Sequence, residues 1–191
     1  RCVRDSRYKY VRNFMSHVPH AQPSQYKDGK KIVQVMRGLH KEGKLNEQQS
    51  RPFVSRRPPE ELYDLQSDPH ELVNLAKAPK HRDRLAAMRK VLHQRMTETR
   101  DMGLIPEPIL EDLGREAGNK YLAFLDNDHS GQTLRLIEVI TAGEANDGAK
   151  LLQHAKSPDP STRYWAAVWL GVNKTAKGKA TLLKLTADSV P

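Results

Sequence analysis

The chain has 191 residues, of which 37% are hydrophobic and 29% are charged, and its formal net charge is +9. This length allows one sizeable domain or two small ones, and the composition is that of a globular protein without an apolar run long enough to span a membrane. The single cysteine, Cys2, excludes an internal disulfide and a cysteine-cluster metal site.

The positive charge is concentrated near the start of the sequence. Residues 1–57 hold 14 Lys and Arg against 4 Asp and Glu, a net +10, whereas the remaining residues hold 18 against 19, a net −1. A basic first third suits contact with a polyanion such as nucleic acid, an anionic membrane or a sulfated glycan. Long cationic side chains that only solvate exposed strands and loops would give the same pattern, so charge alone leaves both interpretations open.

The first predicted element is a strand over residues 7–14, whose side chains are mainly aromatic or long and polar. Because side chains alternate along a strand, one face would carry Tyr8, Tyr10, Arg12 and Phe14. Residues 17–26 contain two prolines, two histidines and two glutamines and predict a loop. A helix that stops near Gly43 is predicted next, from the spacing of Ile32, Val35, Met36 and Leu39.

A second strand and two further helices are predicted downstream. Residues 61–65, Glu-Leu-Tyr-Asp-Leu, have the pattern of a short strand. Asp68, Pro69 and Glu71 predict a helix start, because they can supply a cap, a first-turn proline and a capping-box carboxylate. A longer helix is predicted over residues 82–100, with an apolar stripe of Leu85, Met88, Leu92 and Met96.

From about residue 111 the sequence predicts only helices. Short helical patterns follow one another at 115–125, 132–142, 147–156 and 161–171. An internal repeat with an offset of 31 residues aligns Leu151, Leu152, Ala155 and Pro160 with Leu182, Leu183, Thr186 and Pro191. This period indicates stacked helical hairpins that bury their apolar faces against one another.

Residues 7–14 and, more specifically, residues 60–76, with an E-L-Y-D-L strand, a D-P turn and an E-x-x-N-L-A stretch, resemble the C-terminal subdomain of type I sulfatases. Residues 43–47 and 103–107 are similar to bacterial members near the heparan sulfamidase-like branch. The resemblance covers residues 1–110 and implies an α+β fold of the alkaline-phosphatase-like superfamily. That fold would be a small antiparallel sheet packed by a helix and set against an upstream catalytic domain.

Residues 159–171, which begin with Asp-Pro, are similar to the second helix of a HEAT-like repeat. Residues 111–191 are therefore expected to form an all-α, HEAT-like segment. Because the sequence begins without Met and stops inside the second copy of the repeat, we expect a piece cut from a longer sulfatase.

The resemblance also indicates which chemistry this chain should lack. Sulfatases of this family use a formylglycine, made from Cys or Ser in a C/S-x-P/A-x-R motif, beside a calcium ion. Cys2 does not fit this motif, because Ser6 stands where the arginine is required. No catalytic residue, metal ligand or cofactor is therefore expected here. The formylglycine and calcium would belong to an upstream domain that cleaves a sulfate ester or sulfamate on a sulfated sugar or polysaccharide, in the periplasm or outside the cell.

Contact with substrate is the contribution expected from this chain. The candidate residues carry cationic or hydrogen-bonding groups on or near the predicted loop, as a sulfated sugar requires: Arg12, His17, His20, Gln25 and Tyr26. An ordinary loop with solvated or capped histidines would explain the same residues.

Two further motifs have competing interpretations. Residues 126–131 match the D-x-D-x-S-G opening of an EF-hand, but Ile137 occupies the twelfth position, where a bidentate Glu belongs. A helix cap by Asp128 or Ser130 is favoured instead. Trp165 and Trp169, four residues apart, could form a sugar-stacking platform, but a role in the core of a stacked repeat is favoured.

A different class of function remains open at this point. The helical segment and the basic residues could form a binding module for a protein or a polyanion. Nucleic acid is not an expected partner, because no nucleic-acid-binding motif accompanies the charge. We also expect exposed apolar surfaces to cause self-association of the isolated chain.

Overall fold

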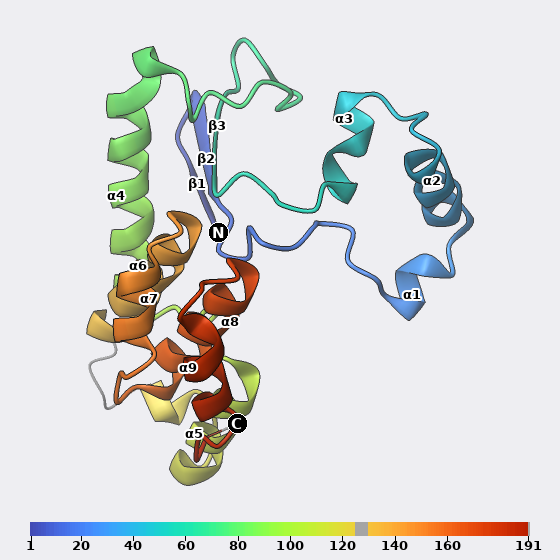
Figure 1. Cartoon of the computed structure of the whole chain (residues 1–191). Helices are drawn as coiled ribbons and strands as arrows, with labels where there is room; N and C mark the ends of the chain where they lie inside the picture. The colour runs from blue at the N-terminus through green and yellow to red at the C-terminus, as the bar shows by residue number, and fades with distance from the viewer. Residues whose placement is uncertain (125–129, 191) are drawn as a thin grey trace. The chain divides into compact units, whose positions relative to one another are not determined.

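The computed structural model describes residues 1–124 and 130–190 and contains two compact units, Arg1–Met88 (unit 1) and Arg89–Pro191 (unit 2) (Figure 1). The division between the units falls inside helix α4 (Arg82–Glu98). Among the described helices, none is both long and apolar enough to cross a membrane. With its small sheet and many helices, the fold is α+β, as the sequence predicted.

Unit 1 is built on a three-stranded antiparallel sheet in the order β1-β2-β3. Its strands are β1 (Cys2–Arg4), β2 (Tyr8–Arg12) and β3 (Glu60–Asp64), and Tyr10 lies opposite Leu62 in the register. β2 and β3 confirm the two predicted strands. β1 was missed, because three residues are too few to show an alternating pattern.

The predicted face of β2 is buried. Tyr8, Tyr10, Arg12 and Phe14 are all buried. The first half of α4 lies beside this sheet, since the guanidinium of Arg84 stacks 4.8 Å from the centre of the Tyr8 ring. Leu85 and Met88 of the predicted helical stripe are buried here, and Leu92 and Met96 are buried in unit 2.

The long connection between β2 and β3 carries four short helices. They are α1 (Gln25–Asp28), α2 (Lys31–Lys41), α3 (Glu47–Ser50) and the 3-10 helix η1 (Arg51–Phe53). α2 confirms the predicted helix, and Gly43 follows it with a left-handed φ of 66°. None of these helices has a buried residue. The apolar face of α2 is therefore covered only in part within unit 1: Met36 and Leu39 are half-buried, whereas Ile32 and Val35 are exposed.

The helix predicted to begin at Asp68 is wrong. This stretch is an irregular turn in which the Asp68 carboxylate accepts hydrogen bonds from the backbone N–H groups of Leu72 (3.0 Å) and Val73 (2.8 Å). Glu71 adopts a left-handed φ of 57°, which a helix does not allow. The next regular element is the 3-10 helix η2 (Pro79–His81).

All regular elements in the described residues of unit 2 are helices. It contains the second half of α4 and then α5 (Glu107–Ala117), η3 (Leu122–Phe124), α6 (Ser130–Glu144), α7 (Gly148–His154), α8 (Pro160–Val172) and α9 (Gly178–Leu185). The last three predicted helices are confirmed as α6, α7 and α8. The one predicted at 115–125 is misplaced, since α5 ends at Ala117 and Gly118 follows with a φ of 95°. Residues 126–129 of the EF-hand-like motif, including the predicted cap Asp128, lie outside the described residues.

The core of unit 2 surrounds α8, which packs against α6, α7 and α9. Trp165 and Trp169 are buried, so their predicted role in the core is confirmed. The Trp165 Nε1 donates a hydrogen bond to the carbonyl oxygen of Leu104 (2.7 Å), and the ring of Trp169 lies against Gly143 of α6. Consecutive packing of short helices agrees with stacked hairpins, whereas their assignment to HEAT repeats stays a prediction.

Candidate anion-binding cleft

Unit 1 contains a cleft of about 600 Å³ between β3, the α3–η1 segment and the chain that leads into and out of β3. Three arginines and a histidine line it, together with three carboxylates and three other polar side chains: Arg51, Arg56, Arg57, His20, Glu47, Glu61, Glu71, Ser50, Tyr63 and Asn74. The three arginines are its distinguishing feature.

Arg57 fixes the loop that forms one wall of the cleft. Its Nε donates to the carbonyl oxygen of Val18 (2.9 Å), and its Nη2 donates to that of Met15 (2.6 Å). Its backbone N–H donates to the Ser16 carbonyl oxygen (2.8 Å), and its Nη1 lies 3.2 Å from Nδ1 of His20. These contacts hold the loop in place around the Arg57 guanidinium, although 37 to 42 residues separate Arg57 from His20 and Met15 in sequence.

The two loop histidines lie in the field of this guanidinium. Burial, followed by the positive charge of Arg57, lowers the pKa of both His17 and His20. Both imidazoles therefore favour the neutral form at neutral pH. Neutral His20 can accept a hydrogen bond from Arg57, which matches the distance between them.

Two of the three cleft carboxylates are bound by neighbouring side chains. The Lys9 Nζ lies 2.7 Å from each carboxylate oxygen of Glu71. Glu61 accepts hydrogen bonds from the Tyr63 hydroxyl and from Asn13 Nδ2 (2.5 Å). Burial and, next, the bond to Glu61 raise the pKa of Tyr63, so its hydroxyl stays protonated as a donor. These partners offset part of the acidity of the cleft wall.

Arg51 and Asn74 connect the cleft to the turn after β3. Arg51 donates from Nη1 to the carbonyl oxygen of Glu71 (3.2 Å) and from Nη2 to that of Leu72. The Asn74 side-chain oxygen accepts a hydrogen bond from the Leu62 N–H (3.0 Å), and its Nδ2 donates to the carbonyl oxygen of Glu60 in β3 (3.1 Å). The irregular turn thereby becomes a fixed wall of the cleft.

The structure brings together only part of the predicted site. His20 lines the cleft, and His17 belongs to the same loop. Arg12 is buried under the sheet, where its Nη1 donates to the carbonyl oxygen of Pro59 (3.0 Å) and its guanidinium stacks on the Phe14 ring. Gln25 and Tyr26 are exposed on α1 and are not among the residues that line the cleft.

Sequence reasoning missed Arg51, Arg56, Arg57 and Asn74. The available signal is the Arg-Arg-Pro-Pro run at 56–59, which places two adjacent arginines just before β3. Among the residues that the structure describes, no three His, Cys, Asp or Glu side chains gather closely enough to hold a metal ion. Guanidinium, imidazole, amide and phenol groups around a cleft equip it to bind an anionic, hydroxyl-bearing ligand.

Comparison with known proteins finds a relative for part of the chain. The chain contains a sulfatase-related region: over 107 residues, 56% of its length, it is 40% identical to an ulvan-active sulfatase of Formosa agariphila. The matched stretch is 18% of that protein, so the chain corresponds to a small part of its relative. No family model matches the chain. No solved structure matches it either.

Proposed function

We propose that this chain is the C-terminal part of a sulfatase that cleaves sulfate esters or sulfamates on sulfated glycans outside the cytoplasm. The observation that carries the proposal is the 40% identity over 107 residues to an ulvan-active sulfatase. Hydrolysis would take place on an upstream catalytic domain with its formylglycine and calcium. The contribution of this chain would be the cleft of unit 1, which would hold an anionic group of the substrate.

The chemistry of the cleft supports that role. A guanidinium group presents parallel N–H donors that match two oxygens of a sulfate, and this geometry distinguishes Arg from Lys. Arg51 lies on η1, while Arg56 and Arg57 lie on the segment before β3, so two walls of the cleft carry positive charge, and Arg51 and Arg57 also donate to backbone carbonyl groups. A volume of about 600 Å³ suits a ligand of one or two sugar rings.

The histidines add a dependence on pH. A bound sulfate would favour the charged form of His20 and so raise its pKa, which burial and then the charge of Arg57 lower. Binding would then take up a proton. The affinity for a sulfated ligand should therefore increase as the pH falls through the range in which His20 titrates.

Isothermal titration of the 191-residue chain with a sulfated uronate–glucosamine disaccharide and its desulfated counterpart would test the proposal. We expect the sulfated sugar to bind more tightly. Arg56→Ala should weaken it about tenfold, because loss of one charge-assisted contact costs about 1.5 kcal/mol. Arg4→Ala is the matched control, since Arg4 is an exposed arginine on β1 that does not line the cleft. Equal affinity for both sugars, or equal effects of the two substitutions, would refute a sulfate-binding role for the cleft.

A further inference from the structure

Unit 2 has a second concave surface that the proposed sugar contacts do not use. A groove of about 440 Å³ runs along α9 and the C-terminal end of α8. Aliphatic side chains form its floor and lysines form its rim: Leu170, Ala176, Leu182, Leu183, Lys174 and Lys179. Leu183 in this groove is 63% exposed.

The exposed leucine belongs to an ordered stripe. Residues 179, 182, 183 and 186 are spaced as i, i+3, i+4 and i+7, so they lie on one face of α9. All of them line the groove. This face carries Leu182 and Leu183 between Lys179 and Thr186, and it is distinct from the face with which α9 packs on α8.

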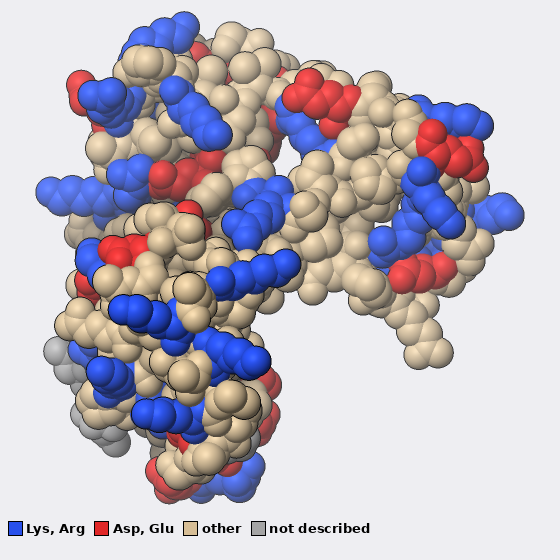
Figure 2. Space-filling model, in the orientation of Figure 1, with Lys and Arg blue, Asp and Glu red and all other residues tan. Residues whose placement is uncertain are grey.

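The charge around the groove is of one sign. Residues 172–187 contain four lysines, Lys174, Lys177, Lys179 and Lys184, and no Asp or Glu. All four lysines are exposed, and no carboxylate of the described residues forms an ion pair with them. The nearest acid in sequence, Asp188, is bound to Arg163. On the face that Figure 2 shows, Lys and Arg side chains gather over α8 and α9.

We propose that this groove binds an acidic amphipathic helix of a partner protein. Apolar side chains of that helix would cover Leu182 and Leu183, and its Asp or Glu residues would lie against the lysine rim. α9 has eight residues and is about 12 Å long, so the groove offers room for about two turns of a partner helix. The proposal is independent of the sulfatase assignment.

The side chains present favour a peptide over a sugar. Sugar rings are usually held by aromatic faces and by planar hydrogen-bonding groups. The groove contains no aromatic side chain and no arginine among its lining residues, whereas the cleft of unit 1 contains three arginines and a tyrosine. Leucines beneath a rim of lysines are complementary to a helix with leucines on one face and glutamates beside them.

Fluorescence anisotropy with the 191-residue chain can test this. The probe is a fluorescein-labelled peptide with Leu on one helical face and Glu elsewhere, compared with a scrambled peptide of the same composition. We expect micromolar binding of the amphipathic peptide alone. Leu183→Asp should weaken it at least about tenfold, and Lys179→Glu should weaken it by a factor of about three to ten.

Two matched variants control for charge and hydrophobicity. Leu134→Asp changes a leucine of α6 that is 48% exposed, and Lys150→Glu reverses an exposed lysine of α7. Both should leave binding unchanged. Circular dichroism at rising temperature should give the same midpoint for Leu183→Asp and the parent, because the changed side chain is exposed.

Three results would overturn the proposal. The first is equal binding of the scrambled peptide, which would reduce the effect to charge. The second is a dimer in light scattering that Leu183→Asp dissociates, which would assign the groove to a second copy of the chain. The third is binding of a sulfated oligosaccharide that Lys179→Glu abolishes and Leu183→Asp does not change, with no binding of the amphipathic peptide.

Discussion

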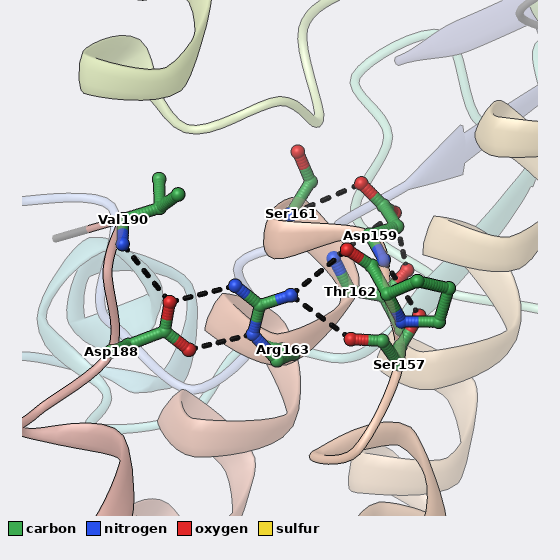
Figure 3. Close-up of polar contacts among 8 residues, drawn as sticks. Ser157, Asp159, Ser161, Thr162, Arg163, Asp188 and Val190 are labelled. Carbon is green, nitrogen blue, oxygen red and sulfur yellow. Dashed lines mark hydrogen bonds and ion pairs between the residues drawn. The ribbon is translucent and has the colours of Figure 1, made fainter.

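The ion pair between Arg163 and Asp188 allows a quantitative prediction about unit 2 (Figure 3). Arg163 Nε lies 2.6 Å from one carboxylate oxygen of Asp188, and Nη2 lies 2.7 Å from the other. The Nη1 of Arg163 also donates to the carbonyl oxygens of Ser157 and Pro158, both at 2.9 Å. The guanidinium group therefore ties the segment after α9 to the loop before α8.

The magnitude follows from the pKa of Asp188. Its bond to Arg163, followed by the backbone N–H of Val190, lowers this pKa from 3.8 to about 2. At neutral pH that difference corresponds to at most about 2.4 kcal/mol of stability. The two side chains are 17% and 15% exposed, so solvent screening reduces the expected value to about 1–2 kcal/mol. Because the folded pKa lies below the unfolded one, the stabilisation is complete above about pH 5, about half remains at pH 3, and most is lost by pH 2.

Urea unfolding of the parent and of Asp188→Asn at pH 7 and pH 3 measures this effect. We expect a loss of about 1–2 kcal/mol at pH 7 and about half of it at pH 3, since titration of the other carboxylates cancels in the comparison. Asp112→Asn removes the 2.8 Å pair with Arg115, whose side chains are 49% and 76% exposed, and should cost less than about 0.5 kcal/mol. A loss from Asp188→Asn that is the same at both pH values would refute the electrostatic reasoning.

Two further predictions concern packing and pH. Gly143→Ala would place a Cβ 2.0 Å from Cγ of Trp169, so we expect a loss of about 2–4 kcal/mol in thermal or urea unfolding. Gly171→Ala, whose Cβ would meet nothing within 4 Å, should be neutral or stabilising by up to about 1 kcal/mol, and similar losses for both would contradict the role of Gly143. Burial lowers the pKa of His17, so the unfolded chain binds the proton more readily and stability should rise from pH 5 to pH 7. His17→Gln should flatten that rise, and parallel pH profiles would show that His17 does not cause it.

Regular elements were predictable where a single face is buried. The alternation in β2 and the stripe of α4 follow directly from packing one side of an element on a core, and both predictions were correct. The turn at Asp68 shows the limit of local signals. An Asp carboxylate that accepts hydrogen bonds from backbone N–H groups a few residues later occurs both at helix N-caps and in turns. The bonds of Asn74 to β3 hold this stretch in its turn, and they depend on a contact 12 to 14 residues away.

The candidate site was predictable only in part, for a similar reason. The histidines could be found, because proline and polar residues mark a loop. The position of Arg57 depends on carbonyl groups of residues 15, 16 and 18, which no local pattern reveals. Arg12 could have been set aside from the sequence alone. The alternation that buries Tyr8, Tyr10 and Phe14 also buries the side chain at position 12.

The net charge of a long stretch can hide a local basic surface. Residues 58–191 together have a net charge of −1, yet residues 172–187 alone carry four lysines without a carboxylate. The two basic surfaces also differ in kind. In unit 1 the cations are arginines among polar groups, whereas in unit 2 they are lysines around leucines. Since guanidinium groups bind sulfate oxygens in pairs and ammonium groups act as point charges, the same net charge favours different ligands at the two surfaces. Arg56→Ala and Leu183→Asp should therefore each impair binding of one ligand class and leave the other unchanged.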